Sequence, residues 1–329
     1  MKLTKIANQL NKDIESNKNF LILPHVMADG DAVGCCIAMA RYLVSLGKKA
    51  VVLMEEKIPY IYSFMQNSAD IRIYSQESEY NNYDVYIAID TGDINRLGKR
   101  KAIFENKLSY NIDHHKTNNG YAKYNHVNED VSSSGEIIYD LLSLLKAQID
   151  HDIAQAIYVA ISTDTGGFRY QNTNKKCFKI SSELMNYGIN IEKISEWIFE
   201  RTNLTKLYLF QKTIQNIKLH CNNKVAVSTL RTEEYLNLDV NDEDFEGLVN
   251  IVKNIEGVEV GVFLRERPNK EEVKGSLRSN TDKVDVSVIA QLNGGGGHAR
   301  AAGLISKKNI NEVYENIIMN LNELFECMQ

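Results

Sequence analysis

Apolar segments of strand length recur through the first 113 residues, and their alternation with helical segments most constrains the fold. The runs that predict strands lie at residues 19–24, 49–55, 83–90 and 107–113. Helical patterns are predicted at residues 31–47, 132–148, 152–163, 174–188 and 203–220, the first of them closed by Gly47. Strands separated by helices predict an α/β fold with a mostly parallel sheet and helices on both faces.

A second unit of the same kind follows. From about residue 221 the order restarts with predicted strands at 224–230, 258–267 and 272–279, a glycine-rich segment at 294–306 and a last helix. A chain of 329 residues is also longer than a usual single core. We therefore expect an N-terminal domain over residues 1–190, a helical linker over 191–220 and a smaller α/β domain over 221–329.

The composition excludes some classes of protein. A hydrophobic content of 43% and a charged content of 25% are those of an ordinary globular protein. The net charge of -5 argues against a basic surface that coats long nucleic acid. No apolar stretch reaches the length of a membrane span, and the first residues lack a signal-peptide core. The five cysteines include no CxxC pair, which suits reduced thiols, so we expect a cytoplasmic protein without membrane contact.

Acidic and histidine side chains follow the predicted strands of the first unit. They are His25, Asp29 and Asp31 after the first strand, Asp90 after the third, and Asp113, His114 and His115 after the fourth; Asp164 stands where a helical pattern breaks. Ligands of open α/β sheets gather at the carboxyl ends of strands. Four close carboxylates cannot all stay ionised unaided, and two divalent cations would balance them. Carboxylate with imidazole favours Mn²⁺ first, with Mg²⁺ or Co²⁺ as weaker options.

Four segments resemble the ordered motifs of the DHH phosphoesterase superfamily: "HVMADGD" (25–31), "AIDTGD" (88–93), "NIDHHKTN" (111–118) and "STDTGGF" (162–168). Two later segments, "VKGSLRSN" (273–280) and "NGGGGHARAAG" (293–303), resemble its accessory domain, DHHA1. The resemblance covers nearly the whole chain in the right order. It implies an N-terminal DHH domain and a C-terminal DHHA1 domain across a cleft.

The resemblance also implies a set of metal ligands. One ion would take His25, Asp29 and Asp90, and the other would take Asp31, Asp90, His114 and Asp164, so that Asp90 is shared. In the HxxxDxD spacing, alternate residues of a short extended loop would send Asp29 and Asp31 to adjacent ions.

Further residues are candidates for catalytic and substrate-binding roles. Asp113 is expected to orient the neighbouring ligand His114. We expect His115 to donate to a phosphate oxygen or to the leaving group, and Arg96 is close enough in sequence to reach the substrate, although a surface ion pair is nearly as plausible. In the second domain, an anion pocket is expected from Arg278, Ser279, Gly295, Gly296, Gly297 and His298.

Chain length and the short second domain resemble the bacterial oligoribonuclease (nanoRNase) and pAp-phosphatase branch of the superfamily. This implies an enzyme that acts on short RNA oligonucleotides and on mononucleotide bisphosphates such as 3′-phosphoadenosine 5′-phosphate (pAp). A linear or cyclic dinucleotide phosphodiesterase with the same site is the alternative, and a catalytically inactive nucleotide-binding module is a third reading. The sequence leaves a homodimer open.

Overall fold

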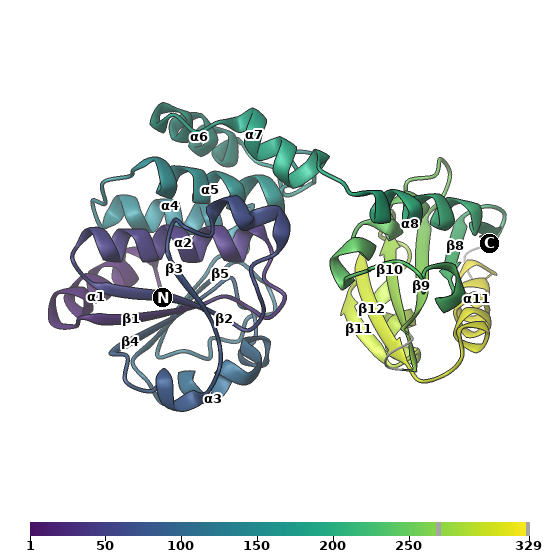
Figure 1. The fold of residues 1–329 in the computed structure, drawn as a ribbon, viewed down its shortest axis with the longest axis horizontal. Coiled ribbons are helices and arrows are strands. Elements are labelled where there is room, and N and C mark those ends of the chain that lie inside the picture. Colours follow the sequence, from purple (N-terminus) through teal and green to yellow (C-terminus); the bar gives the residue numbers. More distant parts are fainter. Residues whose placement is uncertain (268–270, 327–329) are drawn as a thin grey trace. The chain divides into compact units, whose positions relative to one another are not determined.

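The structure is a computed structural model that describes residues 1–267 and 271–326. The chain divides into two compact units, Met1–Arg201 and Thr202–Gln329 (Figure 1). The segment 191–220 is shared between them. The helices α7 (Ile191–Ser195) and η5 (Glu196–Glu200) belong to the first unit, and α8 (Leu204–Gln215) and β7 (Lys218–His220) belong to the second.

The first unit is built on a six-stranded, all-parallel sheet in the order β3-β2-β1-β4-β5-β6. Its strands are β1 (Asn19–Leu23), β2 (Lys49–Met54), β3 (Asp70–Ile73), β4 (Val85–Ile89), β5 (Ser109–Asp113) and β6 (Tyr124–Val127). β1 lies between β2 and β4, with Leu21 paired to Val51 on one side and to Tyr86 on the other. The expected parallel α/β sheet is confirmed, and β3 and β6 add two edge strands that the sequence did not predict.

Helices cover both faces of this sheet (Figure 1). They are α1 (Leu3–Ser16), α2 (Gly30–Ser45), α3 (Lys101–Phe104), α4 (Ser134–Leu144), α5 (His151–Asp164), α6 (Lys175–Leu184) and α7 (Ile191–Ser195). Short turns complete the unit: η1 (Tyr60–Met65), η2 (Glu77–Glu79), η3 (Ile94–Arg100), η4 (Met185–Tyr187) and the π-helix η5 (Glu196–Glu200). Alternate strand residues point to opposite faces, so Phe20 and Ile22 join the core under α2 and α5 while Leu21 and Leu23 join the core beside α3.

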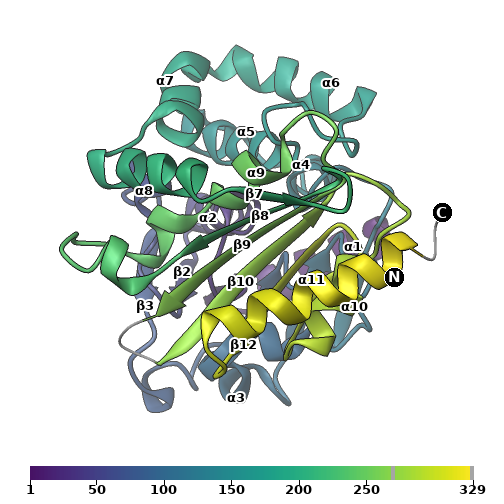
Figure 2. The same ribbon diagram turned by 90° about the vertical axis from the view of Figure 1, so that its right-hand side faces the viewer.

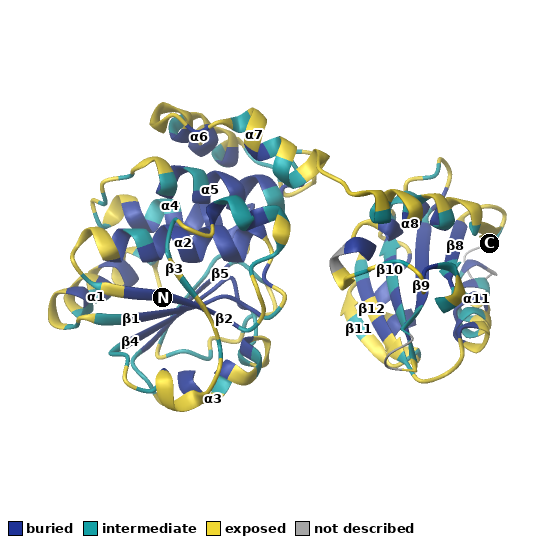
Figure 3. Cartoon of the chain, in the orientation of Figure 1, coloured by how far each residue is buried: buried dark blue, intermediate teal, exposed yellow. Residues whose placement is uncertain are grey.

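The closest helix packing of the unit is between α2 and α5, both of which are buried along most of their length (Figure 3). A Cβ added at Gly34 would lie 2.2 Å from the carbonyl oxygen of Ala156. Only glycine permits this approach of the two backbones. The packing brings the N-terminus of α2 and the C-terminus of α5 to the same end of the sheet as the strand ends described below.

The second unit contains a mixed six-stranded sheet in the order β11-β12-β10-β9-β8-β7 (Figure 2). Its strands are β7 (Lys218–His220), β8 (Val225–Leu230), β9 (Val260–Arg267), β10 (Glu272–Ser279), β11 (Gly295–His298) and β12 (Ala301–Ser306). Only β8 and β9 pair in parallel. The helices are α8 (Leu204–Gln215), α9 (Leu248–Lys253), α10 (Val286–Leu292) and α11 (Ile310–Glu326), with turns η6 (Thr232–Glu234) and η7 (Asp242–Phe245). α10 and α11 cover one face, and α8 and α9 cover the other.

Candidate metal centre

Three adjacent parallel strands deliver polar side chains to one edge of the first sheet. His25 follows the end of β1, Asp90 follows the end of β4, and His114 follows the end of β5. Because β4 lies between β1 and β5, Asp90 stands between the two histidines. Asp90 is only 2% exposed, and its backbone N–H donates to the carbonyl of Ile112 at 2.9 Å.

Helix ends supply the remaining carboxylates. Asp29 caps α2 and accepts a hydrogen bond from the backbone N–H of Ala32 at 3.1 Å, and Asp31 lies in the first helical turn. The expectation of a short extended loop through these two residues is therefore wrong, because the helix already begins at Gly30. Asp164 is the last residue of α5, which packs against α2.

The side chains form two groups that share Asp90. Nε2 of His25 lies 3.7 Å from Oδ2 of Asp90 and 3.7 Å from Oδ2 of Asp29. Nε2 of His114 lies 3.4 Å from the other oxygen of Asp90, Oδ1, and 3.8 Å and 3.6 Å from Oδ2 of Asp31 and Asp164. The structure thus brings together all six residues expected to be ligands: His25, Asp29, Asp31, Asp90, His114 and Asp164.

These separations fit cation binding better than direct hydrogen bonding. Distances of 3.4 to 3.8 Å are too long for hydrogen bonds between the side chains. Nitrogen and oxygen ligands at about 2.1 Å from one ion lie about 3 to 3.5 Å from each other. The donor atoms of His25, Asp29 and Asp90 also lie within 4.8 Å of one another, as do those of Asp31, His114 and Asp164, and His115 forms a third such set with Asp90 and His114. The residues present therefore fit a pair of divalent cations.

The electrostatics of the metal-free group around His114 lead to the same conclusion. Burial, followed by the charges of Asp90 and Asp164, raises the pKa of Asp31 well above its usual value. Burial and the charges of Asp90 and Asp29 raise the pKa of Asp164 to about 8. Burial lowers the pKa of His114, which favours the neutral imidazole that binds metals. A cation at this place relieves the repulsion between the carboxylates.

In the second unit, two predicted substrate-binding residues lie in one row of the sheet. Ala301 of β12 pairs with Arg278 of β10 on one side and with His298 of β11 on the other. Residues directly opposite each other point to the same face, and strands lie about 4.8 Å apart, so the two backbones are roughly 10 Å apart. The structure thereby places the "SLRSN" and "GGGGH" segments two strands apart in one sheet.

Comparison with known families agrees with both parts of this arrangement. The N-terminal domain of the DHH family matches residues 19–161, and the DHHA1 domain matches residues 222–326. The chain belongs to the DHH/DHHA1 phosphoesterase superfamily. It is a hydrolase of that class, and the phosphoesterases with a DHH domain depend on metal ions.

Similarity to known proteins extends over most of the chain. The chain is 27% identical to the "Bifunctional oligoribonuclease and PAP phosphatase NrnA" of Thermus thermophilus over 92% of its own length and 89% of that relative. It is 26% identical to the protein of the same name from Bacillus subtilis, over 91% and 92% of the two chains. A crystal structure of an exopolyphosphatase-related protein from Bacteroides fragilis matches with a TM-score of 0.90 and 27% identity, covering 97% of each chain.

The sequence prediction missed the N-terminus of α4, which holds the buried carboxylate of Asp31. The backbone N–H groups of Ser134 and Gly135 donate to the two oxygens of Asp31 at 2.7 and 2.9 Å. The Ser134 hydroxyl donates to Oδ1 of Asp90 at 2.9 Å. The sequence predicts a helix over residues 132–148, but nothing in the spacing shows that its N-terminus points at Asp31.

His115 and Asp113 form a hydrogen-bonded pair beside the cluster. Nδ1 of His115 lies 2.7 Å from Oδ1 of Asp113, and this contact, set against burial, raises the pKa of His115 to about 9. Asn118 holds the carboxylate from the other side, donating to Oδ2 of Asp113 at 2.6 Å. Asp113 therefore orients His115 through a direct contact. Asp113 is also predicted to orient His114, but among the described residues no hydrogen bond joins these two side chains.

Arg96 lies against a candidate ligand. Its Nη2 is 2.8 Å from Nδ1 of His25, and the same ring nitrogen is 2.7 Å from the carbonyl oxygen of Val26. A histidine that binds metal through Nε2 keeps its proton on Nδ1, and the Val26 carbonyl then accepts it. In that state Arg96 cannot donate to Nδ1, which leaves its guanidinium available to an anion at the site.

The glycine run of the DHHA1 domain, predicted to bind substrate, allows close pairing of two strands. A Cβ at Gly295 would lie 2.1 Å from the carbonyl oxygen of Gly303, and one at Gly297 would lie 2.6 Å from that of Ala301. At Gly296 an added Cβ meets nothing within 4 Å. Two of these glycines thus allow β11 to pair closely with β12, and Gly296 alone has open space beside it.

Some polar residues next to Arg278 and His298 already have hydrogen-bond or ion-pair partners within the domain. Ser279 is buried, and its hydroxyl donates to the carbonyl of Thr281 at 2.8 Å. Arg300 forms an ion pair with Asp282 at 2.6 Å. Burial and the charges of Arg278 and Arg300 lower the pKa of Lys253, so three cationic side chains lie close enough to interact. Lys253 has no motif around it in the sequence and was not predicted.

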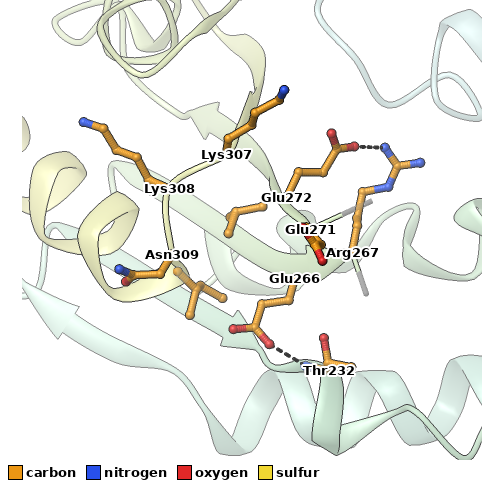
Figure 4. A pocket seen from close by; sticks show the side chains of 10 residues that line it. Thr232, Glu266, Arg267, Glu271, Glu272, Lys307, Lys308 and Asn309 are labelled. Carbon is orange, nitrogen blue, oxygen red and sulfur yellow. Dashed lines mark hydrogen bonds and ion pairs between the residues drawn. The ribbon is translucent and has the colours of Figure 1, made fainter. Parts of the chain in front are cut away.

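A pocket of about 480 Å³ lies elsewhere in the DHHA1 domain (Figure 4). It is at the end of β10 opposite to Arg278, between Arg267, Glu272 and Lys307. Arg267 already pairs with Glu272 at 2.6 Å and with Asp242 at 3.3 Å. Arg265 is also paired with Asp242 and stacks on Phe245. Both arginines are therefore engaged in ion pairs within the domain.

Within residues 1–267 and 271–326, no helix has the length and apolar character that crossing a bilayer requires.

Proposed function

We propose that this chain is a manganese-dependent phosphodiesterase and phosphatase. It degrades oligoribonucleotides of about two to four nucleotides to nucleoside 5′-monophosphates and removes the 3′-phosphate of pAp to give AMP. The similarity to two proteins named bifunctional oligoribonuclease and PAP phosphatase, over nearly the full length of each chain, supports this choice of substrates.

The observation that carries the proposal is the position of the Asp90 carboxylate. Its Oδ2 faces His25 and Asp29, while its Oδ1 faces His114. We propose that it bridges two ions, one held with His25 and Asp29 and the other with Asp31, His114 and Asp164. Two bound divalent cations supply an activated water and stabilise charge on a phosphate. The mixed imidazole and carboxylate donors favour Mn²⁺.

The chain's own residues then position the phosphate ester. His115 is held by Asp113 and lies 3.7 Å from Oδ1 of Asp90, so we assign it a hydrogen bond to a phosphate oxygen or to the leaving group. Arg96 is assigned to a second phosphate oxygen. Such contacts act mainly by orienting the ester and by stabilising its charge.

We assign the preference for short substrates to the DHHA1 domain. Arg278, with His298 two strands away, is proposed to bind a phosphate of the substrate, with the backbone at Gly296 beside it and Ser279 shaping the strand end. Lys253 adds to the positive charge near Arg278. Contacts to phosphate and base face give little sequence preference.

The test is a parallel assay of the manganese-loaded protein on a diribonucleotide, a long RNA, pAp, cyclic di-AMP and pyrophosphate. The proposal expects turnover of the diribonucleotide and pAp far above the others. Dominant turnover of a cyclic dinucleotide would support the alternative phosphodiesterase, and binding without turnover of any substrate would support an inactive nucleotide-binding module. Either result contradicts the proposal.

The variant Arg278→Ala tests whether the DHHA1 domain binds the substrate. Arg278→Ala is expected to reduce kcat/KM on the diribonucleotide and on pAp by about tenfold or more, because a charge-assisted contact is lost. Hydrolysis of the small activated ester bis-p-nitrophenyl phosphate should change little. Equal losses on all three substrates would show that Arg278 supports the fold instead.

A further inference from the structure

A compact turn follows Asp164, and two aromatic rings that the proposed chemistry does not use, those of Tyr170 in the turn and Phe199 on η5, lie against it. The N–H of Gly167 donates to the carbonyl of Ser162 at 2.7 Å, and that of Tyr170 to Thr165 at 3.0 Å. Gly166 and Gly167 have φ values of +58° and +68°, which lets the backbone turn back at the end of α5. The turn therefore stays beside the Asp164 carboxylate.

The rings lie on these two glycines. A Cβ at Gly166 would lie 2.4 Å from the ring of Tyr170, and one at Gly167 would lie 3.6 Å from the ring of Phe199. Gly167 is three residues from Asp164, so their Cα atoms are at most about 11 Å apart. Tyr170 is 57% exposed and Phe199 is 40% exposed. Two partly exposed aromatic rings thus lie on the turn that follows the candidate ligand Asp164.

An arginine of the same turn completes this surface. The guanidinium of Arg169 lies 5.8 Å from the ring centroid of Phe199, and its Nε donates to the carbonyl of Gly166 at 2.6 Å. Within the part of the chain that the structure describes, Arg169 forms no ion pair with a carboxylate. Its charge is therefore available to an anionic ligand beside the rings.

Phe199 lies on the π-helix η5, a type of helix that is rare and often found at functional sites. Trp197 of the same helix packs against Tyr60 and Phe64, with ring centroids at 5.5 and 5.7 Å, and the guanidinium of Arg201 stacks on it at 3.5 Å. Trp197 is the single tryptophan of the chain. Its packing fixes η5 and hence the position of the Phe199 ring.

We propose that Tyr170, Phe199 and Arg169 form a stacking site for one nucleobase of the substrate, specific for the presence of a base and indifferent to which base it is. Flat rings with a guanidinium are the groups that bind single-stranded bases without sequence preference. The Phe199 ring lies against Gly167, three residues after the candidate ligand Asp164, so the site is in the surroundings of the metal cluster. The inference rests on the proposed function, because it requires a nucleotide substrate.

The test distinguishes the contribution of the base to kcat/KM from that of the phosphate. We compare kcat/KM on a diadenylate with kcat/KM on two analogues, each abasic at one position, for the wild type, Phe199→Leu and Phe199→Tyr. The wild type should prefer diadenylate over one of the analogues by about tenfold or more. Phe199→Leu should lose this preference by falling on diadenylate alone, and Phe199→Tyr should retain it.

Binding supplies a second measurement. Because Trp197 is two residues from Phe199, its fluorescence should report titration with AMP more strongly than titration with ribose 5-phosphate, and Phe199→Leu should abolish the difference. Tyr187→Leu is the matched control, since Tyr187 is also 40% exposed but lies on η4. It should behave as the wild type.

The outcomes that overturn the inference are distinct. A wild type without activity on any nucleotide contradicts the proposed function itself. Unchanged base preference in Phe199→Leu contradicts only the stacking site. A change in sedimentation of Phe199→Leu, without loss of base preference, would show instead that this surface joins two copies of the chain.

Discussion

Asp90 adopts a backbone conformation that few side chains tolerate. Its φ of 55° lies in the left-handed region, immediately after the last residue of β4. Outside glycine, such a conformation costs about 1 to 3 kcal/mol, and aspartate and asparagine accept it best. The sharp change of direction presents the carboxylate between His25 and His114, in place of continuing the strand. The strain and the proposed bridging role fall on the same residue.

Asparagine is therefore the substitution that best isolates the charge of Asp90. Asp90→Asn should leave the metal-free protein folded, because the amide tolerates the conformation and removes a buried charge. It should weaken metal binding in both groups, since Asp90 is the carboxylate that we propose they share. Elemental analysis and isothermal titration measure the effect. Full occupancy by two ions in the variant would contradict the bridging role.

Ser134 offers a milder change at the same site. In Ser134→Ala the hydroxyl contact to Asp90 is lost while the backbone N–H to Asp31 remains. Loss of such a supporting hydrogen bond should weaken metal affinity by about tenfold. Ser143→Ala is the matched control on α4, because the Ser143 hydroxyl donates only to its own helix at the carbonyl of Tyr139. Equal affinities in the two variants would show that the Ser134 contact has no effect on the metals.

At the scale of elements, β1 and β4 are joined by a carboxylate outside the strands. Oδ2 of Asp84 accepts hydrogen bonds from the backbone N–H groups of Lys18 and Asn19 at 3.0 and 2.8 Å. Partial burial alone would raise the pKa of Asp84, but these hydrogen bonds outweigh it and lower the pKa below the ordinary value. Asp84 should therefore stabilise the fold above the pKa of the unfolded chain, and lose this contribution as the pH falls through the lower folded value.

We therefore predict that the wild type and Asp84→Asn differ in free energy of unfolding by an amount that depends on pH. Asp84→Asn should lower the free energy of unfolding by about 1 kcal/mol at pH 7, and the difference should shrink below about pH 4. Urea titrations at pH 7, 5 and 3 measure it, with the exposed Asp130→Asn as control. A difference that stays constant over this range would show that the charge of Asp84 is not responsible.

Elements with strong apolar patterns were predictable, and elements without them were not. The runs at 19–24 and 83–90 became the central strands β1 and β4, because buried parallel strands are apolar throughout. The edge strand β3 has two exposed or half-exposed faces, and β6 is partly buried along its length, so neither shows the pattern. The residues of the metal cluster were found because their motifs are local in sequence.

Contacts between distant segments could not be found in this way. Ser134 reaches Asp31 across 103 residues, and the Phe199 ring reaches Gly167 from another helix. Serine before a helix is common as a cap, so its residue type alone does not indicate such a contact. The alignment of Arg278 with His298 in one row of the sheet likewise depends on the pairing of both β10 and β11 with β12.

At the scale of the molecule, the two units have separate hydrophobic cores. The first unit is built around Ile22 and Leu21 on the two faces of its sheet, and the second around Val262 and Phe263. The six candidate ligands all belong to the first unit. A ligand that binds only the folded state stabilises it by about 4 kcal/mol at a thousand times its dissociation constant.

Calorimetry should therefore resolve two unfolding transitions. Mn²⁺ should raise the midpoint temperature of only the transition that belongs to the first unit. Chelation with EDTA should reverse the shift. Trp197 belongs to the first unit, so tryptophan fluorescence should follow the metal-sensitive transition. If both transitions moved with metal, or if fluorescence followed the insensitive one, the assignment of metal binding to the first unit alone would be wrong.

The strand order of the first sheet also governs when the metal centre forms during synthesis. β1 leaves the ribosome early, but its partner β4 begins only at Val85, and the ligands extend from His25 to Asp164. At about 5 to 20 residues per second, roughly 7 to 28 s separate the emergence of the first ligand from that of the last. For this interval the early carboxylates have no complete site, so nascent chains shorter than about 164 residues should not retain the metal.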